Sequence, residues 1–276
     1  MKRILVPTDF SKMADNALNV AAQLARRHNA EIFLLHTLEL PYTQIDAMSS
    51  HSELPEALFF MKLADKRFKE VLRRDNLQDI TVHRVVEFDE TLSGILESCK
   101  KNDIDLIVMG SHGVSGLREM FIGSNTEKVV RSSKIPVLAI KKEHETFEIN
   151  DFVFASDFSK SSEQTYKQAV ELAEALEAKL HLLMVNTPNK FMRSQEANKR
   201  IGKFIASSHF ENYKVHIYND DAVETGILNF SQDINADLIG ISTHGRQGIA
   251  HFLNGSISED VVNQAKRPVI TFKILD

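Results

Sequence analysis

The sequence predicts an α/β fold made of two tandem, doubly wound domains, each with a five-stranded parallel sheet. Three observations support this prediction. The 276-residue chain is about twice the usual domain length, and its two halves carry the same motifs in the same order. Each half also alternates short β runs with helical stretches. Runs such as DLIVMG are apolar almost throughout, which indicates strands covered by helices on both faces.

An internal repeat divides the chain. ILVPTDFS at 4–11 matches FVFASDFS at 152–159, so Asp-Phe-Ser recurs after 157 − 9 = 148 residues. Two later motif pairs recur after 132 residues, namely SHGVSG at 111–116 with THGRQG at 243–248 and Gly123-Ser124 with Gly255-Ser256. The offset falls by 148 − 132 = 16, so the first copy contains about 16 extra residues. Two homologous domains in tandem explain this order.

We expect the domains at 1–141 and 149–276. Between them, Lys141–Asp151 reads KKEHETFEIND, in which six of eleven residues are charged. This composition predicts a short solvated linker. The extra segment at 41–57 contains Pro, Ser and His without clear periodicity, and an amphipathic stretch around Phe60–Leu72 follows it. It is interpreted as a surface loop leading into a longer helix, or else as a partner-binding or site-covering flap.

The elements follow in order within each copy. Ser11 is a good N-cap, and the apolar residues after it recur at helical spacing at Met13, Ala17, Val20, Ala21 and Leu24. The predicted strands of the first copy are Ile4–Val6, Ile32–Leu35, Val82–Val86, Leu106–Met109 and Val137–Ile140. Those of the second copy are Val153–Phe154, Leu180–Val185, Val215–Tyr218, Leu238–Ile241 and Val269–Phe272. Helical stretches separate the strands.

Composition excludes several classes of protein. The formal charge of −5, from 33 basic and 38 acidic residues, does not suggest a nucleic-acid or membrane-surface binder. The single cysteine, Cys99, excludes an intramolecular disulfide and a cysteine-rich metal site. No apolar run is long enough to span a bilayer, and Pro7 and Asp9 interrupt the first one too early for a signal peptide. We expect a cytoplasmic protein without membrane insertion.

Two loops are predicted to meet at one edge of the first sheet, because ligands of open parallel sheets bind outside the carboxyl ends of the strands. The first strand leaves through Pro7-Thr8-Asp9 and the fourth through Met109-Gly110-Ser111-His112-Gly113. Gly123-Ser124 then opens a helix over Asn125–Arg131. Glycines allow close approach to a ligand, and free N–H groups at a helix start favour phosphate. Either loop alone is explained by ordinary capping, but Ser11 can cap the first helix and leave Asp9 free for ribose hydroxyls or an adenine amino group.

The spacing Gly110-x2-Gly113-x9-Gly123-Ser124, with the opening ILVPTDFS and the closing KIPVLAI, resembles the universal stress protein family. The likeness covers nearly all of both halves, and the glycine pattern is that of the family's ATP-binding branch. The resemblance implies an adenine nucleotide alpha hydrolase-like fold with strand order 3-2-1-4-5. It also implies ATP binding and dimerisation through the last strand. Whether Mg²⁺ accompanies the nucleotide stays open.

The resemblance also assigns residues. In the first copy it implies adenosine contacts by Pro7, Thr8, Asp9, Thr37 and Met109, and ribose or phosphate contacts by Gly110, Gly113, Gly123, Ser124 and Asn125. His112 is interpreted as a structural or ligand-contact residue rather than a metal ligand. Family members often have Val at the positions of Thr37 and Asn125.

The second copy matches the family pattern less completely. It retains Asp157, Val185, Gly245, Gly255 and Ser256, but Ala155 replaces Pro7 and Ser242 stands where the first glycine should be. A serine there adds a Cβ and disfavours a positive φ, so we expect its loop to lie farther from a ligand. Nucleotide binding is therefore predicted mainly for the first domain.

Three functions are weighed. The leading hypothesis is an ATP-binding regulatory protein of stress response or signalling, with at most slow hydrolysis. A scaffold that binds no nucleotide is the alternative. An ATP-dependent adenylating enzyme is disfavoured, because its glycine-rich loop after strand one is replaced here by PTDFS or ASDFS. The two last strands, around Val137–Ile140 and Val269–Ile270, are predicted to pair as an intramolecular pseudo-dimer. A further homodimer of tandem chains stays open.

Overall fold

The computed structural model describes residues 1–39, 54–111, 123–243 and 257–274. We call the part from β1 to β5 the N-terminal domain and the part from β6 to β10 the C-terminal domain. The elements of the N-terminal domain are β1 Arg3–Pro7, α1 Lys12–His28, β2 Glu31–Thr37, α3 Leu54–Leu72, η1 Asp75–Leu77, β3 Val82–Glu87, α4 Thr91–Lys101, β4 Leu106–Gly110, α5 Ser124–Ser132 and β5 Val137–Ile140. Those of the C-terminal domain are β6 Asp151–Ala155, η2 Lys160–Ser162, α6 Glu163–Leu176, β7 Lys179–Asn186, η3 Pro188–Lys190, α7 Ser194–Ile205, β8 Tyr213–Asn219, α8 Val223–Asp233, β9 Leu238–Thr243, α9 Ile257–Gln264 and β10 Val269–Lys273.

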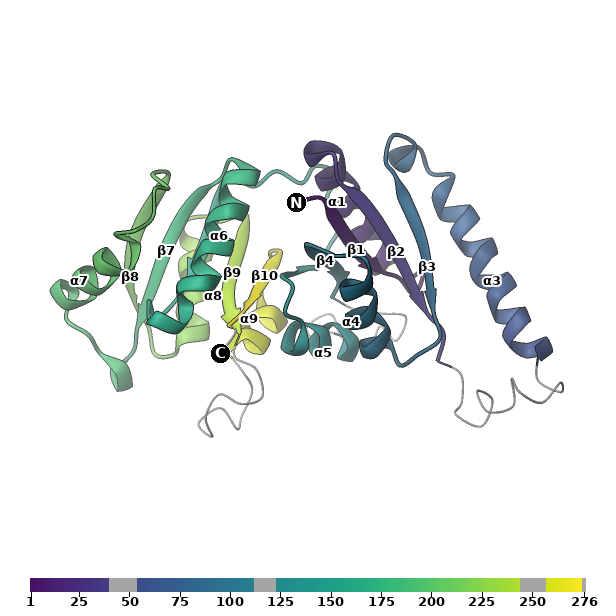
Figure 1. The fold of residues 1–276 in the computed structure, drawn as a ribbon. Coiled ribbons are helices and arrows are strands. Elements are labelled where there is room, and N and C mark those ends of the chain that lie inside the picture. The colour runs from purple at the N-terminus through teal and green to yellow at the C-terminus, as the bar shows by residue number, and fades with distance from the viewer. Residues whose placement is uncertain (40–53, 112–122, 244–256, 275–276) are drawn as a thin grey trace.

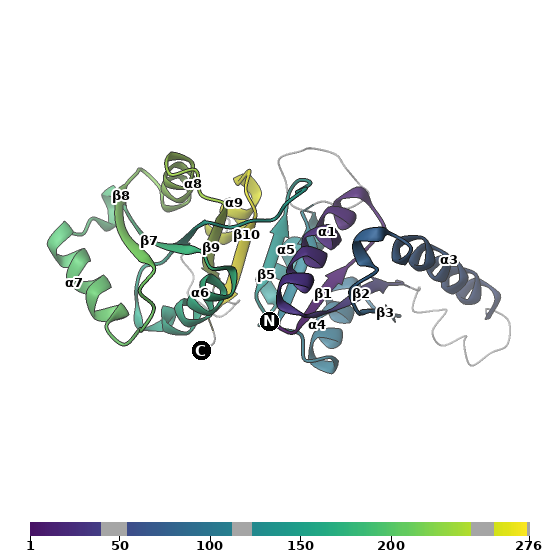
Figure 2. The same ribbon diagram turned by 90° about the horizontal axis from the view of Figure 1, so that it is seen from above.

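The strands form one continuous sheet in the order β3-β2-β1-β4-β5-β10-β9-β6-β7-β8. Each domain has the predicted order 3-2-1-4-5 and is parallel throughout, as shown for β1 with β2 and with β4. The domains meet where β5 and β10 pair antiparallel, with Leu138 opposite Ile270. The predicted pairing of the last strands within one chain is therefore confirmed. Figures 1 and 2 show the consequence, with α3 and α7 at opposite outer ends of the molecule.

In the part of the chain that the structure describes, three apolar cores cover the sheet. The largest joins the two domains, and its buried residues include Leu18 of α1, Phe68 of α3, Val170 of α6 and Ile201 of α7. The helices α4 and α5 cover a second core in the N-terminal domain, and α8 and α9 cover a third in the C-terminal domain. The central strands are thus covered by helices on both faces, which explains their nearly continuous apolar runs, whereas none of the residues of the edge strands β3 and β8 is fully buried.

The predicted strands lie where the sequence placed them, with ends that differ by at most two residues. The predicted N-cap is confirmed, because Ser11 Oγ accepts a hydrogen bond from the N–H of Ala14 at 3.3 Å. Helix α5 begins at Ser124, one residue before the predicted start. The extra segment was predicted to be a loop to residue 57, but α3 already begins at Leu54, and 40–53 lie outside the described residues.

The segment between the domains is not the solvated linker that its charge predicts. Phe147 and Ile149 are buried, with exposed fractions of 7% and 5%. The backbone N–H of Phe147 donates to Gln23 Oε1, and the carbonyl of His144 accepts from Asn19 and Gln23 on α1. Two apolar residues stand among the charged ones, and their side chains pack into the core that the two domains share. The segment is therefore part of the folded structure rather than a flexible linker.

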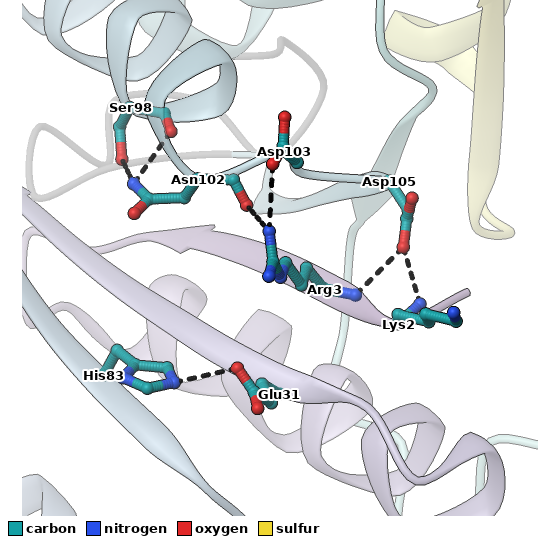
Figure 3. Close-up of polar contacts among 8 residues, drawn as sticks. All are labelled: Lys2, Arg3, Glu31, His83, Ser98, Asn102, Asp103 and Asp105. Carbon is teal, nitrogen blue, oxygen red and sulfur yellow. Dashed lines mark hydrogen bonds and ion pairs between the residues drawn. The ribbon is translucent and has the colours of Figure 1, made fainter.

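The amino ends of the strands are closed by polar contacts. In the N-terminal domain, Asp105 Oδ2 accepts the backbone N–H groups of Lys2 and Arg3 at 2.6 and 3.0 Å (Figure 3). In the C-terminal domain, Asp237 Oδ2 accepts those of residues 150 and 151 at 2.8 and 3.0 Å. The same carboxylate clamp thus joins the first and fourth strands of both domains. The candidate ligand loops lie at the opposite, carboxyl edge.

Candidate functional site

The loop between β1 and α1 is folded into two consecutive side-chain turns. The N–H of Phe10 donates to Thr8 Oγ1 at 2.9 Å, and the N–H of Ser11 donates to Asp9 Oδ1 at 3.0 Å. Phe10 has φ 60°, a left-handed conformation that a bulky residue seldom adopts. Such strain persists only where the surroundings hold it. The expectation that Ser11 caps the helix is confirmed, but Asp9 is not left free, because its Oδ1 accepts the Ser11 N–H.

His36 and Phe68, which sequence reasoning missed, hold this loop in place. The ring of Phe10 lies 4.7 Å from the ring of His36 and 5.3 Å, edge to face, from that of Phe68 on α3. His36 Nδ1 is 2.8 Å from the carbonyl oxygen of Thr8. The Phe in ILVPTDFS, which both copies share, was the available signal, because a repeated aromatic in a polar loop indicates an anchor.

The exit of β4 contacts the start of α1. A Cβ added at Gly110 would lie 2.5 Å from the carbonyl oxygen of Met13 and 2.7 Å from its carbon. The φ of Gly110 lies outside the left-handed region, so a positive φ is not the reason for glycine here, contrary to the sequence-based argument. Glycine is required because the helix backbone passes directly against it.

The start of α5 is held against the same strand end. The N–H of Gly123 donates to the carbonyl of Ser111, and Thr126 Oγ1 donates to the carbonyl of Gly110 at 2.9 Å. Gly123 occupies the N-cap position and offers no side-chain cap, while Ser124 and Asn125 are exposed. The first turn of α5 therefore presents backbone N–H groups and a Ser hydroxyl at the carboxyl edge of the sheet.

The predicted residues of the N-terminal domain thus converge on one edge. Strands β2, β1 and β4 are neighbours, and each ends at this edge. The structure brings together Pro7, Thr8, Asp9, Thr37, Met109, Gly110, Gly123, Ser124 and Asn125. Met109 is 5% exposed and lies in the core beneath the loops. His112 and Gly113 lie outside the described residues.

A polar chain that sequence reasoning missed flanks this edge at the end of β2. Thr37 Oγ1 is 3.1 Å from Thr91 Oγ1, and the Thr91 hydroxyl donates to Glu39 Oε1 at 2.8 Å. The hydrogen bonds that Thr91 donates through its hydroxyl and its backbone N–H, with the charge of Lys128, lower the pKa of the exposed Glu39. Lys128 of α5 also lies 3.6 Å from Glu90. The edge therefore carries a cation beside its acidic residues.

The corresponding loop of the C-terminal domain has the same backbone turns but different occupants. Phe158 has φ 51°, and the Ser159 N–H donates to Asp157 Oδ1 at 3.0 Å. Here Ser162 Oγ also donates to Asp157 Oδ1 at 3.1 Å, and Arg200 of α7 lies 3.9 Å from Oδ2. Burial would raise the pKa of Asp157, but these hydrogen bonds and the Arg200 charge outweigh it and lower the pKa. This carboxylate is thus engaged by its own chain.

The strand exits of the C-terminal domain are also altered. Ser242 Oγ forms a 2.7 Å hydrogen bond with Thr165 Oγ1. The packing of α8 on the end of β7 is instead common to both domains: a Cβ added at Gly226 would lie 2.6 Å from Val185 Cγ1, and one added at Gly94 of α4 would lie 3.0 Å from Thr37 Cγ2. Gly245, Gly255 and Ser256 lie outside the described residues.

Other features contribute no chemistry to this edge. Among the residues that the structure describes, no group of three or more His, Cys, Asp or Glu side chains could hold a metal ion. No helix in the same part of the chain is long and apolar enough to cross a membrane. Cys99 is buried, and burial raises the pKa of its thiol to about 12, so it is unreactive. A cavity of about 240 Å³ lies at the opposite, amino edge and is lined by Ala25, Arg26, Asn29, Ala30, Glu31, Asp79, Ile80 and Thr81.

Comparisons with known proteins agree with this architecture. The family model described as Universal stress protein family matches residues 1–141 and 149–273. A universal stress protein of Synechocystis sp. is 25% identical over 293 residues, covering 99% of this chain and all of that protein. The universal stress protein YxiE of Bacillus subtilis is 31% identical over 146 residues, which are 50% of this chain and 98% of that protein. A crystal structure of a universal stress protein from Archaeoglobus fulgidus superposes with a TM-score of 0.77 at 21% identity, covering 99% of this chain and 98% of that one.

Proposed function

Because the chain belongs to the universal stress protein family and carries two such domains in tandem, we propose that it is a regulatory ATP-binding protein whose main site is in the N-terminal domain. The observation that supports this proposal most is the start of α5, where the N-cap residue Gly123 has no side chain to cap the helix. It is fixed to the exit of β4 by the Gly123 N–H and by Thr126 Oγ1, beside the β1–α1 loop. Helix starts of this kind attract phosphate through their free N–H groups and the helix dipole.

In this proposal the nucleotide lies across the carboxyl edge of the N-terminal domain. Pro7, Thr8, Asp9, Thr37 and Met109 surround the adenosine, and Asp9 accepts hydrogen bonds from ribose hydroxyls. Gly110, His112, Gly113, Gly123, Ser124 and Asn125 bind the ribose and the phosphates. The donor set fits a polyphosphate, because backbone amides, a hydroxyl and nearby Lys128 are all hydrogen-bond donors or cations. Mg²⁺ would enter with the nucleotide.

The C-terminal domain is proposed as a weaker site or as an interaction scaffold. Ser162 and Arg200 engage Asp157 in addition to the Ser159 N–H, whose counterpart on Asp9 is the Ser11 N–H, and Ser242 stands in the place of Gly110. Val185, Gly245, Gly255 and Ser256 remain as the residues that would contact a nucleotide there. We propose a binding protein of stress response or signalling in the cytoplasm rather than an enzyme, with partner contacts that depend on nucleotide occupancy.

Mass analysis of the small molecules released from denatured, purified protein tests this function. Wild-type protein is expected to release ATP, and Gly245→Val to retain most of it. Gly113→Val is expected to lose it, because a branched side chain replaces a glycine in the phosphate loop. Equal ATP content in wild type and Gly113→Val would reject the assignment to the N-terminal domain.

Protein without any ATP, and with no saturable binding on titration, would favour the scaffold. AMP and pyrophosphate appearing with an acceptor molecule would favour an adenylating enzyme. Turnover at about 10 per second, the scale of a typical enzyme, would contradict a regulatory binding protein.

A further inference from the structure

The two domains exchange a pair of lysines across their junction. Lys141 directly follows β5, and Lys273 is the last residue of β10, 132 positions later, so the two occupy equivalent places in the repeat. Lys141 Nζ donates to the carbonyl of Asn263 at 2.6 Å, and Lys273 Nζ donates to the carbonyl of Arg131 at 2.5 Å. Asn263 lies in the last turn of α9 and Arg131 in the last turn of α5.

Each lysine thus binds the helix of the other domain. The two acceptor residues are also 132 positions apart, and β5 and β10 pair antiparallel at the junction. The junction therefore has the twofold symmetry of an isologous dimer interface, within one chain. Helices α5 and α9 flank this junction in both ribbon views (Figures 1 and 2).

The contact has a clear physical effect on a short helix. The last carbonyls of a helix lack partners within it and carry the negative end of the dipole, so an ammonium group there stabilises the last turn. Helix α5 has nine residues and α9 eight, lengths at which an isolated helix is unstable. Lys141 is half-buried, and burial lowers the pKa of its ammonium group to about 8.

We propose that Lys141 and Lys273 form a reciprocal clamp through which each domain steadies the phosphate-side helix of the other, so that nucleotide bound at the start of α5 is sensed by the C-terminal domain. The coupling part of this proposal rests on the function proposed above. Lys273 is then a positioning residue for the N-terminal site, although it belongs to the other domain. By linkage, a nucleotide that binds more tightly because of the clamp strengthens the junction by the same factor.

Hydrogen exchange without nucleotide tests the clamp through two equivalent amides. The N–H of Ser133 donates to the carbonyl of Val129 at the end of α5, and that of Ala265 donates to Val261 at the end of α9. In Lys273→Met, which keeps the aliphatic stem, exchange at Ser133 is expected to accelerate about two- to fivefold, with Ala265 unchanged. Lys141→Met should do the reverse. Lys273→Arg should restore Ser133, and Lys142→Met, a change at the exposed neighbour, should alter neither.

A crossed pattern supports the clamp. Acceleration confined to the mutated residue's own domain, or spread evenly over the chain, would overturn it, because a merely structural lysine would act that way.

Titration with ATP in a Gly245→Val background tests the coupling. Lys273→Met is expected to raise the Kd about two- to fivefold, whereas Lys141→Met leaves it unchanged. Equal Kd values in the parent and Lys273→Met would overturn the coupling while leaving ATP binding intact. A parent that binds no ATP would instead overturn both the proposed function and the coupling, and the exchange pattern would still decide the clamp.

Discussion

The two domains repeat their backbone strain but not all of the polar contacts at their carboxyl edges. Three pairs of equivalent residues have left-handed φ angles between 48° and 60°, and they are Phe10 with Phe158, Asn29 with Glu177, and Asp103 with Asn235. These positions shape loops and helix ends, so the fold itself requires them. The residues facing the carboxyl edge differ. Backbone geometry is therefore common to both domains, whereas the polar contacts at the carboxyl edge, on which the proposed nucleotide binding depends, are not.

The clearest difference is how each domain packs its first helix on its fourth strand. In the N-terminal domain α1 begins at Lys12 and its backbone contacts Gly110. In the C-terminal domain a 3₁₀ turn at Lys160–Ser162 replaces the first helical turn, and α6 begins only at Glu163. That change goes together with a side chain at Ser242, whose hydroxyl bonds to Thr165.

The largest predicted effect comes from moving the serine into the N-terminal domain. Gly110→Ser should destabilise that domain by about 2–3 kcal/mol, because its Cβ would meet the Met13 carbonyl and α1 would have to shift. Urea unfolding measures the loss, and ATP retention should fall with it. The reverse change, Ser242→Gly, should cost about 1 kcal/mol, from the lost hydrogen bond and the added backbone freedom.

A double variant sharpens this test. Ala17→Thr supplies the N-terminal domain with the counterpart of Thr165, 148 residues away. If the start of α1 can adopt the C-terminal arrangement, Gly110→Ser with Ala17→Thr should lose less stability than the two single variants lose together. Harmless surface changes alter stability by up to about 0.5 kcal/mol. If Gly110→Ser alone costs no more than this, close packing at Gly110 does not distinguish the domains.

The next effect is an acid sensitivity that His216 gives the C-terminal domain. His181 lies between Asp151 Oδ1 at 2.7 Å and His216 Nε2 at 3.0 Å. Burial, with the charges of His181 and two lysines, lowers the pKa of His216 to about 4. Between pH 6.5 and 4 the unfolded chain therefore binds a proton that the folded chain does not, and stability falls as the pH is lowered.

We expect His216 to contribute about 2 kcal/mol to this fall in stability. One pKa unit corresponds to about 1.4 kcal/mol, and the full change from 6.5 to about 4 is not counted because His216 is only half-buried. His216→Gln keeps an N–H donor for His181 and should remove most of the dependence. Tyrosine fluorescence is a suitable probe, because Tyr166, Tyr213 and Tyr218 of the four tyrosines lie in this domain. The equivalent edge of the N-terminal domain holds Glu31 and His83 at 2.9 Å (Figure 3). An unchanged pH dependence in His216→Gln would assign the acid sensitivity elsewhere.

Much of this comparison was predictable from the sequence, and the rest depended on contacts between distant segments. Periodicity gave every described strand, and the repeat gave the two domains and their pairing. The glycine spacing placed Gly110 and Gly123 at one edge. The spacing could not show that residue 110 must be glycine to leave room for the Met13 carbonyl, because that contact joins residues 97 positions apart (110 − 13 = 97). The engagement of Asp157 by Arg200 was invisible for the same reason, and Phe147 was hidden among charged neighbours.

A smaller effect is expected from releasing the carboxylate of the C-terminal loop. Arg200→Met removes a charge 3.9 Å from Asp157 and a hydrogen bond to the Phe158 carbonyl. The pKa of Asp157 should rise, and the stability that its lowered pKa provides near neutral pH, which is lost as the pH falls through the folded value, should shrink. The change should stay below about 1 kcal/mol, because the Asp157 side chain is 65% exposed. Titration by NMR measures the pKa, with Arg67→Met, which breaks a surface pair with Glu70, as the control.

The smallest effect tests whether the polar chain at the end of β2 belongs to the ligand site or only to the fold. Thr37→Val gives the N-terminal domain the residue found at Val185. It removes one hydrogen bond to Thr91, whose hydroxyl still donates to Glu39, so the loss of stability should be about 0.5 kcal/mol. ATP affinity should change by less than about twofold, because RT ln 2 is about 0.4 kcal/mol and a buried methyl replaces the hydroxyl. A tenfold loss of affinity with unchanged stability would place the Thr37 hydroxyl on the nucleotide. The two domains would then differ in what they recognise as well as in whether they bind.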